Sequence, residues 1–275
     1  MSKAALHSIH VHPVKALRGQ ALREAAVEPW GLAGDRRWAL IDEAGKVVTQ
    51  REHPHLALAA AELLPGGGIR VSASGLDPLT VAVPDPVGTT TARWSGEKIE
   101  TVPAGSEAAE WFTTYLGEDV TLVHLDDPAV RRPIDDPPYG RPGETVSLAD
   151  AYPLLLTTLA SLDALNSLIA QGDHPDEGPL PMNRFRPNVV VAGTAPWAED
   201  DWKRIAIGEV VFRSAKMCGR CVVTTTDQAT AERGKEPLRT LGRHRRFGNQ
   251  LAFGQNLVPE TTGLVRIGDP VTVLE

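Results

Sequence analysis

The sequence predicts an α+β fold that is rich in β-structure. Apolar and polar residues mix in many short runs, a pattern typical of strands. Glycine and proline, at 25 and 22 of the 275 residues, separate these runs at short intervals. Short strands joined by many turns favour a sandwich or a barrel over a doubly wound parallel sheet. Helical periodicity is confined to two segments, so we expect only a few helices.

The expected strands follow one another along the whole chain. They cover residues 6–11, 38–41, 46–49, 81–83, 121–124, 188–191 and 209–212, with two more around a turn within 264–274. Residues 42–45 separate the second strand from the third, as the loop of a β-hairpin does.

Two segments have the spacing of amphipathic helices. The first is expected to begin with Ser106 as its N-cap and to stop at Gly117. The second is expected over residues 159–170, with Gly172 beyond its end. Apolar stripes three and four residues apart define both, and we expect both to be packing elements. The stripes are Ala108, Trp111, Phe112 and Tyr115 in the first, and Leu159, Leu162, Leu165 and Ile169 in the second.

A proline-rich segment divides the chain near its middle. Residues 126–143 hold five prolines, a density that we expect to prevent both a helix and a central strand. We interpret the segment as a linker or a long loop near a site. The sequence therefore predicts an N-terminal domain over 1–125 and a second domain over 144–275.

The composition excludes several classes of protein. A formal net charge of −7 makes a general nucleic-acid binder unexpected, because phosphate contacts require a basic face. No run approaches the roughly 20 apolar residues of a membrane span, so we expect no membrane partner. Histidines at positions 7, 10 and 12 interrupt any secretory h-region, so the cytoplasm is the expected compartment.

The two cysteines, Cys218 and Cys221, exclude a framework of disulfides, a four-thiolate zinc site and an ordinary [2Fe–2S] cluster. Four interpretations of the pair stay open. A thioredoxin-like redox pair requires a βαβ context, and a zinc site requires two further ligands. One cysteine could instead be a single thiolate ligand or nucleophile, or both could be buried and inert. We expect Arg220 to favour the thiolate of its neighbour Cys221.

Cationic side chains recur where predicted strands begin or end. Arg186 precedes Pro187, which favours an extended backbone, and an arginine fixed there suits a bidentate grip on phosphate. Asn188 adds a donor and an acceptor. Lys15 and Arg36 lie at other strand ends, and four arginines fall within 239–246. Each of these alone could be an ordinary surface feature.

Taken in order, these stretches resemble the MOSC superfamily, in which an N-terminal β-barrel domain precedes a MOSC domain. The resemblance runs from His12 to Leu274 and is strongest to the molybdenum-containing, amidoxime-reducing branch, which includes the mitochondrial amidoxime-reducing component. Its motifs are H-P-V-K at 12–15, G-D-R at 34–36, T-Q-R at 49–51, F-R-P-N at 185–188, C-x-R-C-x-x-T-T at 218–225, F-G-Q at 253–255 and I-G-D-P-V at 267–271.

The resemblance implies a fold, a cofactor and a reaction. The fold is an N-terminal β-barrel-like domain followed by a MOSC β-barrel domain with a few helices. The cofactor is the pyranopterin dithiolene molybdenum cofactor, with Cys221 as the protein thiolate on molybdenum. The reaction is reduction of an N–O bond in amidoximes, N-hydroxylamines or N-oxides, with the oxygen released as water. The residues implied to hold the cofactor are Lys15, Arg36, Arg186, Asn188 and Arg220, with Thr158 and Ser161 near further contacts.

The chain departs from the family pattern at two hydroxyl positions. Ala16 and Gly219 stand where eukaryotic relatives usually have serine, so the pterin contacts are expected to differ. With two cysteines the chain cannot hold an iron–sulfur cluster alone. Electrons are therefore expected from a separate ferredoxin- or cytochrome-like carrier with a flavin reductase.

Two further functions compete with the reductase. A cofactor carrier or sulfur-transfer protein would use a cysteine persulfide, as the cofactor sulfurases that give the MOSC domain its name suggest. A regulatory module would use Cys218 and Cys221 as a disulfide switch, and would require both cysteines equally.

Overall fold

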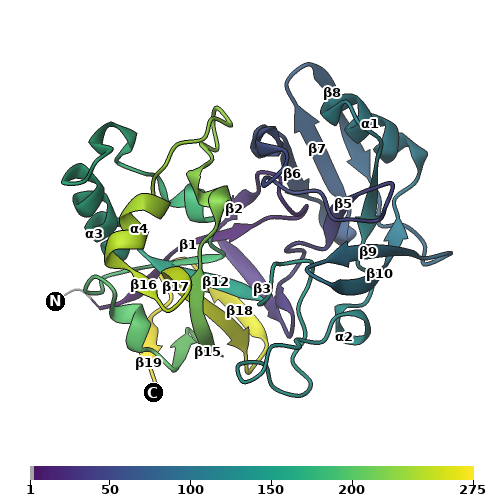
Figure 1. Cartoon of the computed structure of the whole chain (residues 1–275). Coiled ribbons are helices and arrows are strands. Elements are labelled where there is room, and N and C mark those ends of the chain that lie inside the picture. The colour runs from purple at the N-terminus through teal and green to yellow at the C-terminus, as the bar shows by residue number, and fades with distance from the viewer. Residues whose placement is uncertain (1–2) are drawn as a thin grey trace.

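The computed structural model describes residues 3–275, whose strands form four sheets (Figure 1). The largest sheet has nine strands in the order β19-β14-β15-β17-β12-β13-β1-β2, with β16 attached to β17. These strands are β1 (Ala5–Val11), β2 (Gln20–Leu22), β12 (Leu154–Thr158), β13 (Val189–Ala192), β14 (Arg204–Ile207), β15 (Val210–Gly219), β16 (Arg246–Phe247), β17 (Gln250–Pro259) and β19 (Val271–Val273).

Three smaller sheets complete the β-structure. A four-stranded sheet has the order β5-β11-β10-β9, and two three-stranded sheets have the orders β18-β3-β4 and β6-β7-β8. Their strands are β3 (Glu24–Glu28), β4 (Gly31–Leu32), β5 (Trp38–Asp42), β6 (Ala60–Leu63), β7 (Ile69–Ala73), β8 (Leu76–Val81), β9 (Thr90–Trp94), β10 (Glu97–Pro103), β11 (Val120–His124) and β18 (Gly263–Arg266).

The helices are few and lie at the periphery. Helix α1 (Ser106–Leu116) packs on β11 and β8, and α3 (Leu159–Ala170) contacts α4 (Leu238–His244) on the other side of the molecule (Figure 1). Helix α2 (Pro128–Arg131) is one turn. The short 3-10 helices are Pro54–Leu58, Pro65–Gly67, Pro175–Glu177, Met182–Phe185, Ala198–Asp201 and Val222–Thr225.

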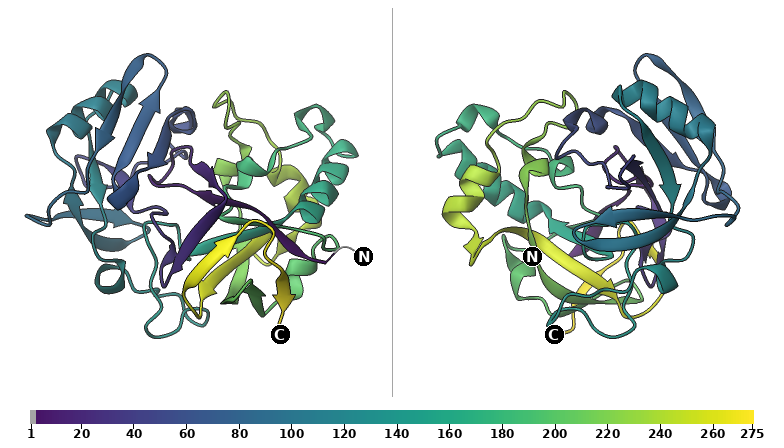
Figure 2. Two further views of the ribbon diagram at one scale, coloured as in Figure 1. Left: turned by 180° about the vertical axis from the view of Figure 1, so that it is seen from behind. Right: turned by 45° about the vertical axis from the view of Figure 1, so that its right-hand side comes forward.

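In two of the sheets, strands from the N-terminal segment pair with strands from the C-terminal half. Strand β1 lies between β13 and β2, and β3 pairs with β18, as the adjacent purple and yellow strands in Figure 2 show. A bridge between Ala5 and Pro270 also brings β1 back to the segment before β19. The large sheet therefore curls, although the strand pairings of residues 3–275 do not form a closed barrel. The division at 126–143 stays a prediction.

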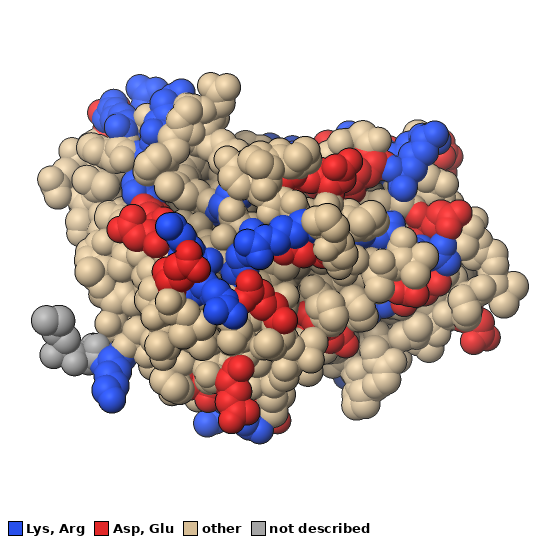
Figure 3. Space-filling model, turned by 90° about the horizontal axis from the view of Figure 1, so that it is seen from below, with Lys and Arg blue, Asp and Glu red and all other residues tan. Residues whose placement is uncertain are grey.

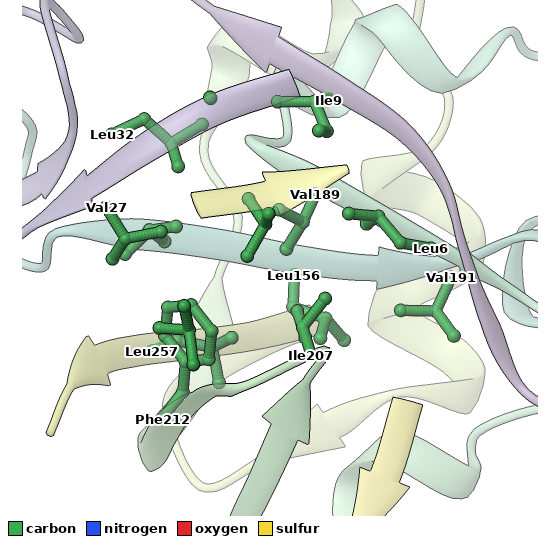
Figure 4. Packing of buried hydrophobic residues seen from close by; sticks show 14 of the residues in the cluster. Leu6, Ile9, Val27, Leu32, Leu156, Val189, Val191, Ile207, Phe212 and Leu257 are labelled. Carbon is green, nitrogen blue, oxygen red and sulfur yellow. The ribbon is translucent and has the colours of Figure 1, made fainter. Parts of the chain in front are cut away.

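The main apolar core lies inside this curled sheet. Leu6 and Ile9 from β1 pack with Val189, Leu156 and Phe212 from the central strands (Figure 4), and all five are fully or almost fully buried. Burial of this apolar surface stabilises the sheet at roughly 25 cal/mol per Å². Because residues from both ends of the chain supply it, the core joins the two halves.

The structure confirms both main helices and most of the predicted strands. Helix α1 ends at Gly117, which takes the left-handed conformation, but Gly105 rather than Ser106 is its N-cap. The strand predicted at 81–83 ends at Val81 instead. The turn after β5 forms as expected, but its second arm makes only isolated bridges at Lys46 and Val47, because Lys46 bridges to β9.

The proline-rich segment differs from the expectation that it excludes a helix. Pro128 occupies the first turn of α2, where its missing N–H costs nothing, and the Asp127 carboxylate accepts from the N–H groups of Ala129 and Val130. The rest of the segment is irregular, as predicted.

Within residues 3–275 no helix has the length and apolar character needed to cross a membrane. On the face shown in Figure 3, basic and acidic side chains lie next to one another.

Candidate functional site

A cavity of about 290 Å³ lies where the N-terminal and C-terminal segments meet. Residues 15–16, 36 and 49–51 line it from one half. The lining residues from the other half are 149–152, 154–155, 185–186, 188, 216, 218–221, 223–224, 250 and 256. Lys15, Arg36, Arg186, Asn188, Arg220 and Cys221 all belong to its lining. The structure thus gathers six of the predicted site residues from positions up to 206 residues apart in the chain.

Cys221 follows the end of β15 and precedes the 3-10 helix Val222–Thr225. Hydrogen bonds from its threonines to preceding backbone carbonyls stabilise that short helix. The N–H and the hydroxyl of Thr224 donate to the Cys221 carbonyl, at 3.1 and 2.9 Å. Cys218 lies within β15, and both cysteines are free thiols in the cavity wall. Across residues 3–275, no three His, Cys, Asp or Glu side chains form a metal-binding group.

The arginine beside Cys221 is not the one that the sequence predicted. Arg220 was expected to favour the Cys221 thiolate, but its Nη1 lies 2.8 Å from the sulfur of Cys218. Its Nη2 donates to the Phe185 carbonyl at 2.8 Å, which turns the guanidinium away from Cys221. Arg51 is the cation beside Cys221 instead. Burial acts to lower the pKa of Arg51, but the Asp150 carboxylate and the neighbouring Cys221 side chain outweigh burial and raise it.

Arg36, Arg186 and Asn188 form one hydrogen-bonded unit in the cavity wall. Nη1 of Arg36 donates to Asp35 at 2.5 Å and to Oδ1 of Asn188 at 3.1 Å, and Nη2 donates to the Arg186 carbonyl at 3.1 Å. Oδ1 of Asn188 also accepts from the Leu155 N–H, so two hydrogen bonds fix the orientation of this side chain. The Asp35–Arg36 pair is therefore a cross-link between distant segments.

Arg186 has a left-handed backbone with φ of 53°, not the extended one that Pro187 led us to expect. It ends the 3-10 helix Met182–Phe185, and its N–H donates to the Asn183 carbonyl. Nη2 donates to the Leu17 carbonyl at 2.7 Å. Burial and the neighbouring Arg36 lower the pKa of Arg186 to about 9, so its charge is poorly compensated in this site.

The buried Lys15 forms an ion pair with the more exposed Asp150 on the same cavity. Nζ of Lys15 lies 2.5 Å from Oδ1 of Asp150 and 2.9 Å from the Leu148 carbonyl, and sits over the Trp94 ring at 4.1 Å. Burial lowers the pKa of Lys15 to about 8 even though Asp150 acts to raise it. Burial acts to raise the pKa of Asp150, and Lys15 and Arg51 outweigh it and hold that pKa well below its usual range.

The lining as a whole carries an excess of positive charge. Of the described residues that line the cavity, six are lysine or arginine and one is a carboxylate, in a chain of net charge −7. The Nε of Arg220 is buried and has no hydrogen-bond partner among the residues described. Among the residues described, Arg186 and Arg220 have no carboxylate partner, and two such cations with a buried, unpartnered donor favour an anionic ligand with several acceptor oxygens.

Comparison with known protein families agrees with this geometry. Residues 3–119 match the MOSC N-terminal beta barrel domain, and residues 143–272 match the MOSC domain. The chain belongs to the MOSC family. The human protein named mitochondrial amidoxime-reducing component 1 is 33% identical over 96% of this chain and 81% of its own length. The Xenopus laevis protein of the same name is 30% identical over 95% of this chain and 79% of its own length.

A second group of MOSC relatives has another name. The Danio rerio protein named molybdenum cofactor sulfurase is 29% identical over 94% of this chain, which corresponds to 32% of the sulfurase. This MOSC chain therefore aligns with about a third of that longer protein.

Two predicted site residues of the MOSC chain lie outside the cavity lining. The Thr158 hydroxyl caps α3 by accepting from the Ser161 N–H at 3.1 Å. Both hydroxyls hydrogen-bond to the buried carboxylate of Glu199, at 3.2 Å from Thr158 and 2.9 Å from Ser161. These contacts place both residues at the N-terminus of α3, and their part in holding the cofactor stays a prediction.

Sequence reasoning missed four residues of this MOSC site: Arg51, Asp150, Tyr152 and Lys216. Arg51 lies in the T-Q-R motif, which was the one available signal for it. Lys216 is two residues before Cys218, and the sequence reasoning gave it no role. The proline-rich segment reaches Lys216 and Tyr152 through Asp136, which supports its interpretation as a loop near the site.

Proposed function

We propose that this MOSC protein binds the molybdenum cofactor and reduces N-oxygenated small molecules such as amidoximes, N-hydroxylamines and N-oxides. The observation that carries the proposal is Cys221 in the wall of a cavity with six cationic side chains and one carboxylate. The relatives named for amidoxime reduction, similar over 95–96% of this chain, support it.

The residues present fit the cofactor. Its phosphate and dithiolene are anionic, and Lys15, Arg36, Arg186 and Arg220 would hold them with charge-assisted hydrogen bonds. Asn188 would contact the pterin directly or hold Arg36 toward it, because its Oδ1 already accepts from Arg36. The buried Nε of Arg220 would gain the acceptor that it lacks. The thiolate of Cys221 would be the soft protein ligand of molybdenum.

The chain's own residues would then hold one another in position and balance the charge of the site. When bound, the cofactor supplies two-electron oxygen-atom chemistry to the N–O bond. Arg51 lies beside Cys221 and keeps positive charge next to the thiolate, and Asp150 holds Arg51 in place at 3.3 Å. The sulfur of Cys218 lies 2.8 Å from Nη1 of Arg220, and the proposal assigns this cysteine no step in the reaction.

Electrons would come from a separate ferredoxin- or cytochrome-like carrier with a flavin reductase. The compartment is also open to test. The sequence led us to expect the cytoplasm, whereas the similar amidoxime-reducing components are named mitochondrial.

Turnover of benzamidoxime with a chemical electron donor tests the proposal. We expect the cofactor-loaded wild-type protein to form benzamidine. Cys221→Ser should lose at least about 100-fold in rate, and the control Cys218→Ser should keep most of it. Equal losses in the two variants would support the disulfide switch and contradict the reductase.

The similarity to molybdenum cofactor sulfurase favours a second candidate, a carrier that transfers the cofactor or its sulfur from a persulfide on Cys221. This candidate predicts sulfur that cyanide releases from the wild type and not from Cys221→Ser. It also predicts no benzamidine from loaded protein, so clear turnover would exclude it.

A further inference from the structure

Lys216 is a cavity residue for which the cofactor has no need. It lies on β15 opposite Asn256 of β17, and both line the same cavity as Cys221. The four cations proposed to hold the cofactor come from other segments, and Arg51 is paired with Asp150. Lys216 is thus the remaining charged group in the lining.

The proline-rich segment holds the Lys216 ammonium in place. Oδ2 of Asp136 forms an ion pair with Nζ of Lys216 and accepts the Tyr152 hydroxyl at 2.7 Å. The rings of Tyr139 and Tyr152 flank the ammonium, at 4.9 and 5.3 Å from Nζ to each centroid. A carboxylate and two aromatic faces fix a lysine more firmly than a surface ion pair does.

Neither partner of Lys216 in this cluster is suited to donate a proton. Burial acts to raise the pKa of Asp136, but hydrogen bonds from Lys216 and Tyr152 outweigh burial and lower it. Burial and the Asp136 carboxylate raise the pKa of Tyr152 well above its usual range. Near neutral pH, Asp136 is therefore a carboxylate and Tyr152 a neutral phenol, and neither is a ready proton donor.

The proposed reaction consumes protons at the cavity. Cleavage of R₂N–OH by two electrons and two protons gives R₂NH and water, and the electrons come from the external one-electron carrier. Arginine does not give up a proton near neutral pH. Lys15 is enclosed, with a side chain 7% exposed and bonded to Leu148 and Asp150. The side chains of Lys216 and Asp136 are 21% and 32% exposed, so solvent can restore a proton there.

We propose that Lys216 is the general acid that protonates the oxygen as the N–O bond breaks. The inference rests on the proposed reductase function and adds a catalytic residue to it. The competing role is a tether, in which the Lys216–Asp136 pair only fastens the proline-rich segment to β15. Arg213 of the same strand already fastens this segment, because its Nη2 lies 2.7 Å from both carboxylate oxygens of Glu144 and 3.0 Å from the Tyr139 carbonyl.

Lys216→Arg separates the two roles, because arginine keeps the ion pair and the contacts with the tyrosine rings but does not donate a proton. We expect its molybdenum and pterin content and its melting temperature to equal those of the wild type. Its kcat should fall about 100-fold or more, and its solvent isotope effect should rise as proton transfer becomes limiting. Methylammonium added to Lys216→Ala should restore part of the rate. The control Glu144→Gln loosens the segment without touching Lys216 and should keep kcat within a few-fold.

A Lys216→Arg enzyme with kcat within about twofold of an active wild type would overturn the inference and leave the reductase proposal intact. A similar loss in Glu144→Gln would also overturn it in favour of the tether. A loaded wild type that forms no benzamidine overturns the reductase proposal, and the inference falls with it.

Discussion

Asp150 is the residue on which the charges of the cavity converge. Its carboxylate binds Nζ of Lys15 at 2.5 Å and Nη2 of Arg51 at 3.3 Å, and its backbone carbonyl accepts from Arg132 and Trp94. The carboxylate therefore connects a predicted cofactor residue with the cation beside Cys221. Arg36 and Lys216 have carboxylate partners of their own in Asp35 and Asp136, whereas Asp150 is shared by two cations, and burial leaves Lys15 with a lowered pKa.

The lowered pKa of Lys15 predicts anion binding that weakens with rising pH. In the cofactor-free chain Lys15 loses its proton as pH rises through about 8, so a bound anion loses that attraction. We expect the dissociation constant for inorganic pyrophosphate, measured by calorimetry, to rise by up to about tenfold between pH 7 and 9, with proton uptake on binding. In the Lys15→Arg variant the cation stays protonated, and this rise should be absent. A rise of the same size in both proteins would assign it to another group.

Single residues were predictable where a motif surrounded them. Lys15, Arg36, Arg186, Asn188, Arg220 and Cys221 were each named from a short motif, and the structure places all six around one cavity. Partners across the cavity were not predictable. The sequence placed Arg220 beside Cys221, but the direction of its side chain depends on the Phe185 carbonyl, 35 residues away. Asp150 and Lys216 carried no local signal, because their partners lie 135 and 80 residues away.

The pairing of β17 with β12 depends on close backbone packing at Gly254. Gly254 has φ of +81°, and a Cβ built on it would lie 2.5 Å from the Leu156 carbonyl oxygen. A carbonyl inside a sheet cannot move away without breaking its strand pairing. Packing thus explains the glycine of the F-G-Q motif at 253–255.

Gly254→Ala should therefore lower the free energy of unfolding by about 2–4 kcal/mol, from backbone strain together with the contact. Gly248→Ala is the matched control, because Gly248 also has a positive φ, of +58°, but no atom within 4 Å of the added Cβ. We expect it to cost about 1 kcal/mol. Urea denaturation of the two variants measures the difference, and equal costs would contradict the packing argument.

Elements were predictable where periodicity or a terminating glycine marked them. Helices α1 and α3 follow from apolar stripes, and Gly117 marks the end of α1. The single turn of α2 was not predicted, because the count of prolines outweighed the favourable position of Pro128 after Asp127. The prediction of a second hairpin strand after β5 was wrong for another reason. The hydrogen bonds of that segment go partly to β9, which a local pattern does not reveal.

At the scale of the whole molecule, the strands of the N-terminal segment complete the C-terminal core. Leu6, Ile9 and Val11 of β1 and Val27 of β3 are buried in the same cluster as Phe212 and Leu257. Pairing of β1 with β13 joins positions about 180 residues apart, and no pattern in either strand specifies it. Sequence reasoning could therefore predict two β-rich halves but not the exchange of strands between them.

This exchange predicts that residues 144–275 do not fold independently, although they contain nearly all of the MOSC domain match. The fragment lacks β1, β2 and β3, which leaves β13 and β18 with open edges and the core incomplete. We expect it to unfold without a cooperative transition and to bind a hydrophobic dye, whereas coexpression with residues 1–125 should restore cooperative unfolding. A sharp thermal transition in the isolated fragment would support the predicted linker as a true domain boundary.

The central claim is that the cavity beside Cys221 holds the molybdenum cofactor. Its most direct test is the molybdenum and pterin content of protein purified from a host that synthesises the cofactor. The account predicts stoichiometric molybdenum and pterin in the wild type and in Cys218→Ala, and loss of most of the molybdenum in Cys221→Ala. Wild-type protein without molybdenum, or Cys221→Ala with as much molybdenum as the wild type, would contradict it.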